Sequence, residues 1–302
     1  MVTSTSHGKR ILLSAPENPQ FDPQPLTGEQ QTLEPFVAVP FPAPAPQPMA
    51  RAPKAGENPV WNGWDVLRIA GLTLLLTLFV VPVMVVLGAH FFVYPHESWF
   101  EVARKPALAL LSQLLAYIVV VVYMIMLIQG KYRTRFWQAL RWNWPGIASM
   151  SFVGVGVLML GFDVLGRFLP MPKSTPFDQF FDRPSDAYLV ALFAVTLGPL
   201  IEEIFFRGLL YPVVARRLGA VSGILLTALP FGLMHFVQYG YSWGAVLIVF
   251  LVGVVLTAVR AMTKSVAASF LAHVGYNGTL MVLAAWTTDG FKHMEKAAML
   301  LF

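Results

Sequence analysis

Long apolar runs separated by short polar segments fill the chain from Asp65 onward. Each run approaches the ~20 residues that a helix needs to cross about 30 Å of hydrocarbon. The predicted spans are residues 66–92, 107–129, 146–169, 187–214, 220–238, 243–262 and 265–287. This pattern predicts an all-α fold, a polytopic transmembrane bundle of about seven spanning helices.

The two ends of the chain have a different pattern. Residues 1–60 hold 12 of the 23 prolines and no sustained apolar period, which is typical of a disordered, extended tail. A Pro-rich ligand for a partner domain would have the same composition. Residues 291–302 form a short charged stretch that we interpret as an amphipathic segment at the membrane surface. We therefore predict a Pro-rich tail over residues 1–60 and a transmembrane domain over residues 61–302.

Composition agrees with a protein that has lipid as its main solvent. The chain is 56% hydrophobic and 12% charged, whereas soluble domains average about 25% charged residues. Its net charge of +5 comes from clusters between apolar runs and not from a basic face, so we expect no nucleic-acid partner. Connections that carry these cationic clusters alternate along the chain with connections that carry none, and by the positive-inside rule this alternation puts the N-terminus in the cytoplasm and the C-terminus outside. The clusters are Lys131, Arg133, Arg135 and Arg141, then Arg216 and Arg217, then Arg260 and Lys264.

Ionisable residues inside a span cost about 2.5–3.5 kcal/mol each on insertion scales, so each needs a partner or a function. In the third run, Asp163 and Arg167 lie four residues apart, and we predict a structural ion pair. In the fourth run, Glu203 and Arg207 have the same spacing and the same predicted role. The neighbouring Glu202 points about 100° away on an α-helix, which leaves its carboxylate free for other work.

The fourth and fifth runs are predicted to bring two polar residues together. Gly219 lies 17 residues after Glu202 and 16 residues before His235. In an antiparallel hairpin folded at this glycine, an equal rise of ~1.5 Å per residue brings Glu202 and His235 to the same depth. Pro199 cannot donate a hydrogen bond to the carbonyl of Val195 and should bend the fourth helix just before the glutamates. Such a bend opens space for a site.

The seventh run places His273 and Asn277 four residues apart on one helix face. Alone, a histidine or asparagine inside a membrane is usually an interhelical hydrogen-bond partner. That explanation becomes weak for five costly side chains on three helices. We therefore interpret the following residues as one functional site: Glu202, Glu203, His235, His273 and Asn277.

These residue types favour one reaction. A glutamate opposite a histidine suits general-base activation of water. A second histidine with an asparagine supplies donors for the oxyanion that forms when an amide carbonyl is attacked. The combination indicates peptide-bond hydrolysis. The sequence has no cysteine, no His-Glu-x-x-His, no Gly-x-Ser-x-Gly and no two intramembrane aspartates on separate helices, so it offers nothing to the cysteine, zincin-like, serine and aspartyl mechanisms.

The same residues carry a family resemblance over residues 185–287. Their motifs resemble those of the CAAX protease and bacteriocin-processing (CPBP, or Abi) family, the type II CAAX prenyl endopeptidases. Each motif alone is weak, but three in order are specific. The motifs are Glu202-Glu203-x-x-x-Arg207, followed by Gly208, then Phe231-x-x-x-His235, then His273-x-x-x-Asn277.

The resemblance implies an intramembrane endopeptidase in which Glu202 and His235 activate water while His273 and Asn277 hold the oxyanion. The implied substrate is a membrane-tethered peptide or protein at the lipid bilayer, prenylated or not. The implied supporting residues are Glu203, Arg207 and Phe231.

Metal dependence stays open at this point, because the family has been described both as metal-dependent and as glutamate-dependent without metal. Glu202, His235 and His273 could supply three ligands to zinc and leave a position for water. Asn277 is a poor zinc ligand, and the two histidines lack the close spacing of a preformed site. We therefore favour a metal-free site, with zinc as the alternative.

Two other functions are weighed against hydrolysis. Some members of the family are linked to bacteriocin self-immunity, so the chain could be a non-catalytic membrane scaffold or immunity protein whose polar residues bind a partner helix. A transporter with a midplane site is less favoured, because the two halves of the chain show no matching pair of interrupted helices.

Overall fold

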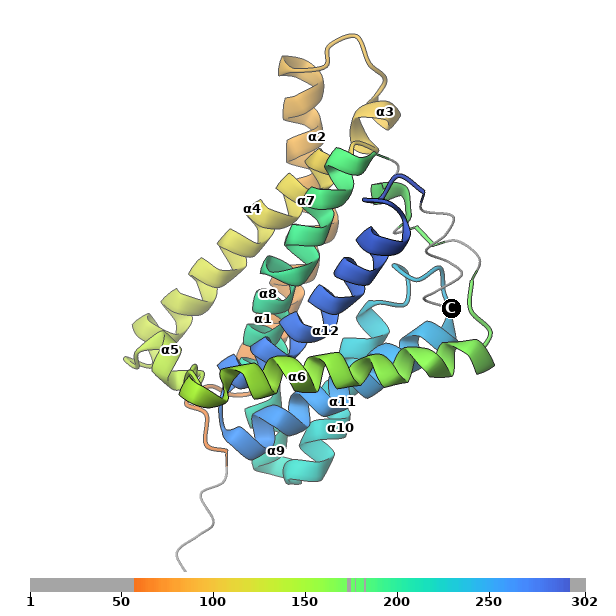
Figure 1. The fold of residues 1–302 in the computed structure, drawn as a ribbon. Coiled ribbons are helices and arrows are strands. Elements are labelled where there is room, and N and C mark those ends of the chain that lie inside the picture. The colour runs from red at the N-terminus through yellow and green to blue at the C-terminus, as the bar shows by residue number, and fades with distance from the viewer. Residues whose placement is uncertain (1–56, 173–174, 177, 182, 294–302) are drawn as a thin grey trace, which may run out of the picture. The chain divides into compact units, whose positions relative to one another are not determined.

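The computed structural model describes residues 57–172, 175–176, 178–181 and 183–293, and these residues form an all-α bundle (Figure 1). The predicted fold class is confirmed. The tail predicted over residues 1–60 lies outside the described residues except for 57–60, and the segment predicted over 291–302 lies outside them except for 291–293. The boundary predicted between tail and domain stays a prediction.

Helical elements follow one another along the whole described chain; η1, η2 and η6 are π-helical, and η3, η4 and η5 are 3₁₀-helical. The elements are α1 (Gly63–Leu75), η1 (Leu76–Val80), α2 (Val81–Phe92), α3 (Trp99–Ala103), α4 (Pro106–Ile125), η2 (Met126–Lys131), α5 (Phe136–Ala139), η3 (Gly146–Ala148), α6 (Ser149–Met159), η4 (Leu160–Phe168), η5 (Asp178–Phe181), α7 (Pro184–Val195), α8 (Leu197–Glu202), η6 (Glu203–Leu210), α9 (Tyr211–Leu218), α10 (Ala220–Met234), α11 (Trp243–Thr263) and α12 (Val266–Thr287).

Six helical stretches of the described chain are long and apolar enough to cross a membrane, and each corresponds to one predicted span. They are Gly63–Phe92, Pro106–Lys131, Gly146–Phe168, Pro184–Leu218, Trp243–Thr263 and Val266–Thr287. The chain is therefore an integral, multi-pass membrane protein.

The predicted span 220–238 is the exception. Its helix, α10, has 15 residues and ends at Met234, which gives a length of about 22 Å and not the ~30 Å of a hydrocarbon core. Beyond it the chain turns, with φ of 62° at both Gly240 and Tyr241. The early end matters because it places His235 at the end of a helix that stops inside the bundle.

The α9–α10 hairpin confirms the fold that we predicted at Gly219. This residue has φ 84° and ψ 168°, a conformation that glycine adopts without steric penalty. Just after this turn α10 packs closely against α9, because a Cβ on Gly223 would lie 2.9 Å from Cβ of Ala215. The two helices therefore run antiparallel in direct contact.

Two glycines allow α6 to cross α12 with backbones in contact (Figure 1). A Cβ on Gly156 would lie 2.1 Å from the carbonyl oxygen of Ala272, and one on Gly275 would lie 2.4 Å from that of Val153. Small residues permit such approach between membrane helices. The crossing fixes α12 at the turn that carries His273.

The cationic clusters meet at one end of the bundle, around the first described residue, Glu57. Arg260 contacts both of its carboxylate oxygens, at 3.0 and 3.2 Å, and Arg141 and Lys264 each reach Oε1 at 3.3 Å. Burial alone would raise the pKa of Glu57, but the charges of these three residues outweigh it and hold the pKa below its ordinary value. From the remaining cluster, Arg216 donates to the carbonyl of residue 59 at 3.0 Å. All three clusters therefore lie at the same end, as their alternation predicts.

The predicted Asp163–Arg167 ion pair is wrong. Asp163 accepts a hydrogen bond from the hydroxyl of Tyr276 at 3.0 Å, while Arg167 is exposed. Both residues lie in η4, which is 3₁₀-helical. At three residues per turn, residues four apart point about 120° away from each other. In a 3₁₀-helix, a spacing of four residues therefore does not place two side chains on one face.

Candidate active site

The glutamate pair lies where the fourth span changes its helical geometry. The helix is interrupted at Thr196, with φ −116° and ψ −74°, three residues before Pro199. Glu202 is the last residue of α8, and Glu203 begins the π-helix η6. Pro199 removes a backbone donor near the break, as predicted. Wide π-turns of this kind are frequent at functional sites.

A buried ionic network surrounds Glu203. Its Oε1 lies 2.9 Å from Nη1 of Arg207, and both side chains are 0% exposed, so the predicted ion pair is confirmed. Ser269 donates to Oε2 of Glu203 at 2.6 Å, and Arg207 donates to Thr257 at 3.2 Å. Nδ1 of His273 also lies 2.9 Å from Oε1 of Glu203. A satisfied network of this kind is rigid, and here it orients the His273 ring.

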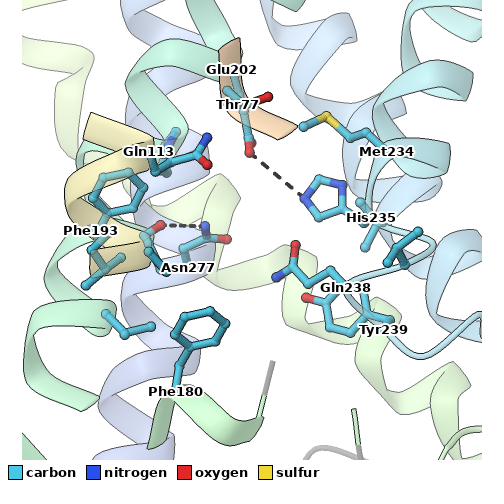
Figure 2. A pocket seen from close by; sticks show the side chains of 18 of the residues that line it. Thr77, Gln113, Phe180, Phe193, Glu202, Met234, His235, Gln238, Tyr239 and Asn277 are labelled. Atoms are coloured by element: carbon cyan, nitrogen blue, oxygen red, sulfur yellow. Dashed lines mark hydrogen bonds and ion pairs between the residues drawn. The ribbon is translucent and has the colours of Figure 1, made fainter. Parts of the chain in front are cut away.

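Two histidines face the carboxylate of Glu202. Nε2 of His235 lies 4.0 Å from its Oε1, and Nε2 of His273 lies 3.7 Å from its Oε2 (Figure 2 shows Glu202 and His235). Each ring is held by its other nitrogen: Nδ1 of His235 lies 2.8 Å from the carbonyl oxygen of Phe231, and Nδ1 of His273 contacts Glu203. Because both partners are acceptors, each Nδ1 carries the proton, and in a neutral ring Nε2 is left as an acceptor. Three predicted groups therefore converge.

Phe231 packs against the rings of both histidines. Its side chain is 1% exposed, and the guanidinium carbon of Arg207 lies 4.3 Å from its ring centre. Its ring contacts His235 and His273 edge to face, at 5.2 and 5.8 Å between centroids. Phe231 thus packs against the guanidinium of Arg207 and against both imidazole rings.

Asn277 lies on the same cavity but is held by a different partner. Its Nδ2 donates to the carbonyl oxygen of Ala194 at 2.8 Å (Figure 2). One of its two N–H groups is therefore in use, and the other N–H and the amide oxygen remain available. The structure places the four predicted catalytic residues around one cavity, with Asn277 apart from the Glu202–histidine contacts.

The cavity has a volume of about 580 Å³ and contains residues that our sequence reasoning missed. Gln113 and Tyr117 enter from α4, and Gln238 and Tyr239 enter from the turn after α10. The signal for the first two was present in the sequence: Gln113 and Tyr117 are two polar groups four residues apart in a mainly apolar run. Much of the remaining wall is apolar, with Leu74, Leu78, Phe180, Phe193, Leu280 and Met281 among its residues.

The zinc alternative requires three protein ligands arranged around one ion. In the described part of the chain, no three side chains from histidine, cysteine, aspartate and glutamate are placed so that they could hold one metal ion. Glu202, His235 and His273 approach one another without forming such a set. The proposed reaction therefore uses these side chains alone.

Comparison with known proteins gives one match. No curated protein and no solved structure matches the chain significantly. The family model of the Rce1-like type II CAAX prenyl endopeptidases matches residues 184–279, which run from the start of α7 through His273 and Asn277. The resemblance found in the three motifs is therefore confirmed: residues 184–279 of this membrane protein are similar to the Rce1-like type II CAAX prenyl endopeptidases.

Proposed function

We propose that this chain is an intramembrane endopeptidase that hydrolyses a peptide bond in a membrane-associated substrate. The observation that carries the proposal is the approach of two histidine Nε2 atoms to one carboxylate, at 4.0 and 3.7 Å, on the wall of a cavity. An ionised carboxylate and a neutral Nε2 are both acceptors, so a water molecule between them can donate a proton to each. The match to a family of endopeptidases supports the same function.

In this proposal, Glu202 is the general base. It takes a proton from the water that Nε2 of His235 helps to orient, while the water oxygen forms a bond to the carbonyl carbon of the substrate. The carbonyl π-electrons move to oxygen and give a tetrahedral oxyanion. When the C–N bond breaks, the oxyanion re-forms the C=O bond and Glu202 returns its proton to the leaving amine. The new carboxylic acid releases its remaining proton to solvent and leaves as a carboxylate with the other fragment.

Asn277 and His273 are the proposed donors to the oxyanion. The second N–H of Asn277 is available for it, and Nε2 of His273 becomes a donor when the ring carries its second proton. The carboxylate of Glu203, 2.9 Å from Nδ1 of His273, would stabilise that protonated ring. Glu203, Arg207 and Phe231 act through position and not through contact with the substrate.

The apolar part of the wall suits a substrate with a lipid chain. Leu74 and Leu78 come from the first span, and Phe193 comes from α7 (Figure 2 shows Phe193). Prenylated peptides combine an apolar chain with a peptide bond, and they are the substrates that the family description names. We therefore propose them as the first class to test.

The proposal is tested with the full chain in liposomes and a library of prenylated and acylated peptides. Wild-type protein is expected to cleave at least one peptide, and Glu202→Gln and His235→Ala are expected to lower the rate about 10²–10⁴-fold. Complete removal of metal is expected to leave the wild-type rate unchanged. Cleavage at the full rate by Glu202→Gln would refute the assignment.

The same variants separate hydrolysis from the alternative, a non-catalytic scaffold or immunity protein. Interhelical polar contacts in membranes average only about 0.6 kcal/mol, so a scaffold would tolerate Glu202→Gln. Loss of function in this variant, with folding intact, favours the endopeptidase.

A further inference from the structure

Four carboxamide residues line the cavity: Gln179 in η5, which is exposed, and three half-buried ones from three other elements. Gln113 comes from α4, Gln238 from the turn that follows α10, and Asn277 from α12 (Figure 2). Gln113 and Gln238 are both half-buried, and the first three spans, α4 included, lie outside the segment that matches the family model. The paired glutamates and histidines do not use any of these amides in the contacts described above.

The orientation of one amide is fixed by its partner. Nδ2 of Asn277 donates to the carbonyl oxygen of Ala194, and turning the amide over would set two acceptors against each other. In Figure 2 the amide oxygen of Asn277 points into the open space that Glu202 also faces. Asn277 therefore presents an acceptor to anything that enters the cavity.

The other two amides keep hydrogen-bonding capacity on the cavity side. Gln113 hydrogen-bonds Tyr117, one turn further along α4, and this uses only part of what a carboxamide can form. For Gln238, the described residues offer its side chain no hydrogen-bond partner, and in Figure 2 its amide points into the same open space. A carboxamide inside an apolar bundle is costly unless water or a ligand satisfies it.

We propose that Gln113, Gln238 and Asn277 bind the peptide backbone of the substrate and hold it extended across Glu202. A primary carboxamide has an N–H donor and a C=O acceptor in one plane, which is the complement of a peptide group. An extended peptide presents its own N–H and C=O groups to both sides, so amides on separate walls can pair with it at the same time. This inference rests on the proposed function, because it identifies how that site would hold a peptide.

Backbone recognition has a consequence for specificity. Hydrogen bonds to main-chain groups do not depend on side-chain identity, so the three amides fix where the peptide lies without selecting its sequence. Selectivity is then left to the apolar wall and the substrate's lipid chain. Gln113 and Gln238 thus help to place the scissile carbonyl near Glu202, while Asn277 accepts from the backbone through its oxygen and keeps its second N–H for the oxyanion.

The test combines backbone-modified peptides with amide variants. The probe is a fluorescent lipidated peptide that wild-type protein cleaves; if no peptide is cleaved, the probe is the peptide of the library that binds most tightly. Its analogues are N-methylated at each peptide bond in turn. Binding is measured in detergent with the full chain carrying Glu202→Gln, so that no peptide is consumed. Gln113→Leu and Gln238→Leu are added singly. Gln129→Leu is the matched control, because Gln129 lies in the same span as Gln113 and is exposed.

At one or more positions, N-methylation is expected to weaken binding about 2- to 10-fold in the parent protein and in the Gln129→Leu control. In Gln113→Leu or Gln238→Leu, the penalty at one of these positions is expected to disappear, as in a double-mutant cycle. A purely structural effect of either substitution would weaken the peptide and its analogues equally.

Two results would overturn the inference. One is that N-methylation weakens binding by the same factor in all variants, and the other is that no lipidated peptide binds saturably. If Gln113→Leu fails to fold, Gln238→Leu decides, because Gln238 lies outside the span-length helices. Backbone-sensitive binding without cleavage by wild-type protein would instead remove the proposed function and keep the inference.

Discussion

Glu203 holds His273 through a 2.9 Å contact between Oε1 and Nδ1, and this contact aims the opposite ring nitrogen, Nε2, at the carboxylate of the preceding residue, Glu202. Two adjacent glutamates therefore have different surroundings. Glu203 is fully buried among partners, whereas Glu202 is 15% exposed and borders the cavity.

This difference predicts that the two glutamates separate stability from activity. Glu203→Gln leaves the charge of Arg207 buried and unpaired, which should lower the free energy of unfolding by about 3–5 kcal/mol. Glu202→Gln should abolish cleavage and leave thermal stability in detergent nearly unchanged. Melting temperatures and cleavage rates of both variants provide the check, and equal melting temperatures would contradict the buried network.

The α6–α12 crossing predicts a position-specific effect of one methyl group. Gly156→Ala would place Cβ 2.1 Å from a backbone oxygen of α12, so the helices must separate, and we expect a loss of about 1–3 kcal/mol in stability with reduced activity. The control is Gly154→Ala on the same helix, where a Cβ would have open space around it. If both variants melt at the same temperature, the close crossing is wrong.

The contacts of Glu57 predict a pH dependence of stability. Its pKa in the folded protein lies below the ordinary value of 4.5, so its contribution is complete above about pH 4.5 and decreases as pH falls through the folded-state pKa. Between neutral pH and pH 3 to 4, wild-type protein should lose more thermal stability than Glu57→Gln, which lacks the titrating group. If the melting temperatures of the two proteins change in parallel with pH, the ion pairs of Glu57 are not formed in solution.

The gathering of the cationic clusters predicts which end of the bundle faces the cytoplasm. Because the sequence has no cysteine, single cysteines give no background in thiol labelling. Arg217 lies in the last turn of α9, and His96 lies in the α2–α3 connection at the other end of the bundle (Figure 1); both positions are exposed. An impermeant reagent on intact cells should label His96→Cys, and it should label Arg217→Cys only after permeabilisation. The reverse pattern would invert the proposed orientation.

The sequence predicted those parts of the site that depend on regular spacing. Residues four apart in a helix gave the Glu203–Arg207 pair, and equal distances from Gly219 gave the approach of Glu202 to His235. The same reasoning failed at Asp163 and Arg167, because nothing in the spacing shows that the helix tightens to a 3₁₀ turn there.

Residues outside the polar motifs were the other omission. Gln238 falls within the predicted span 220–238, but α10 ends at Met234, so a residue expected on a helix lies in a turn beside the cavity. Gln113 shares a helix face with Tyr117, but its role depends on how α4 packs against other helices, which the spacing does not show. Such tertiary placement leaves little signal in one sequence.

The most direct test of the central claim, that Glu202 activates a water molecule, is a single turnover in H₂¹⁸O with enzyme in excess over a cleaved lipidated peptide. Direct attack by water predicts that the new product carboxylate contains one ¹⁸O atom after the first turnover. An unlabelled product, with ¹⁸O appearing in the Glu202 side chain, would show that the carboxylate itself attacks the peptide bond and would contradict the account.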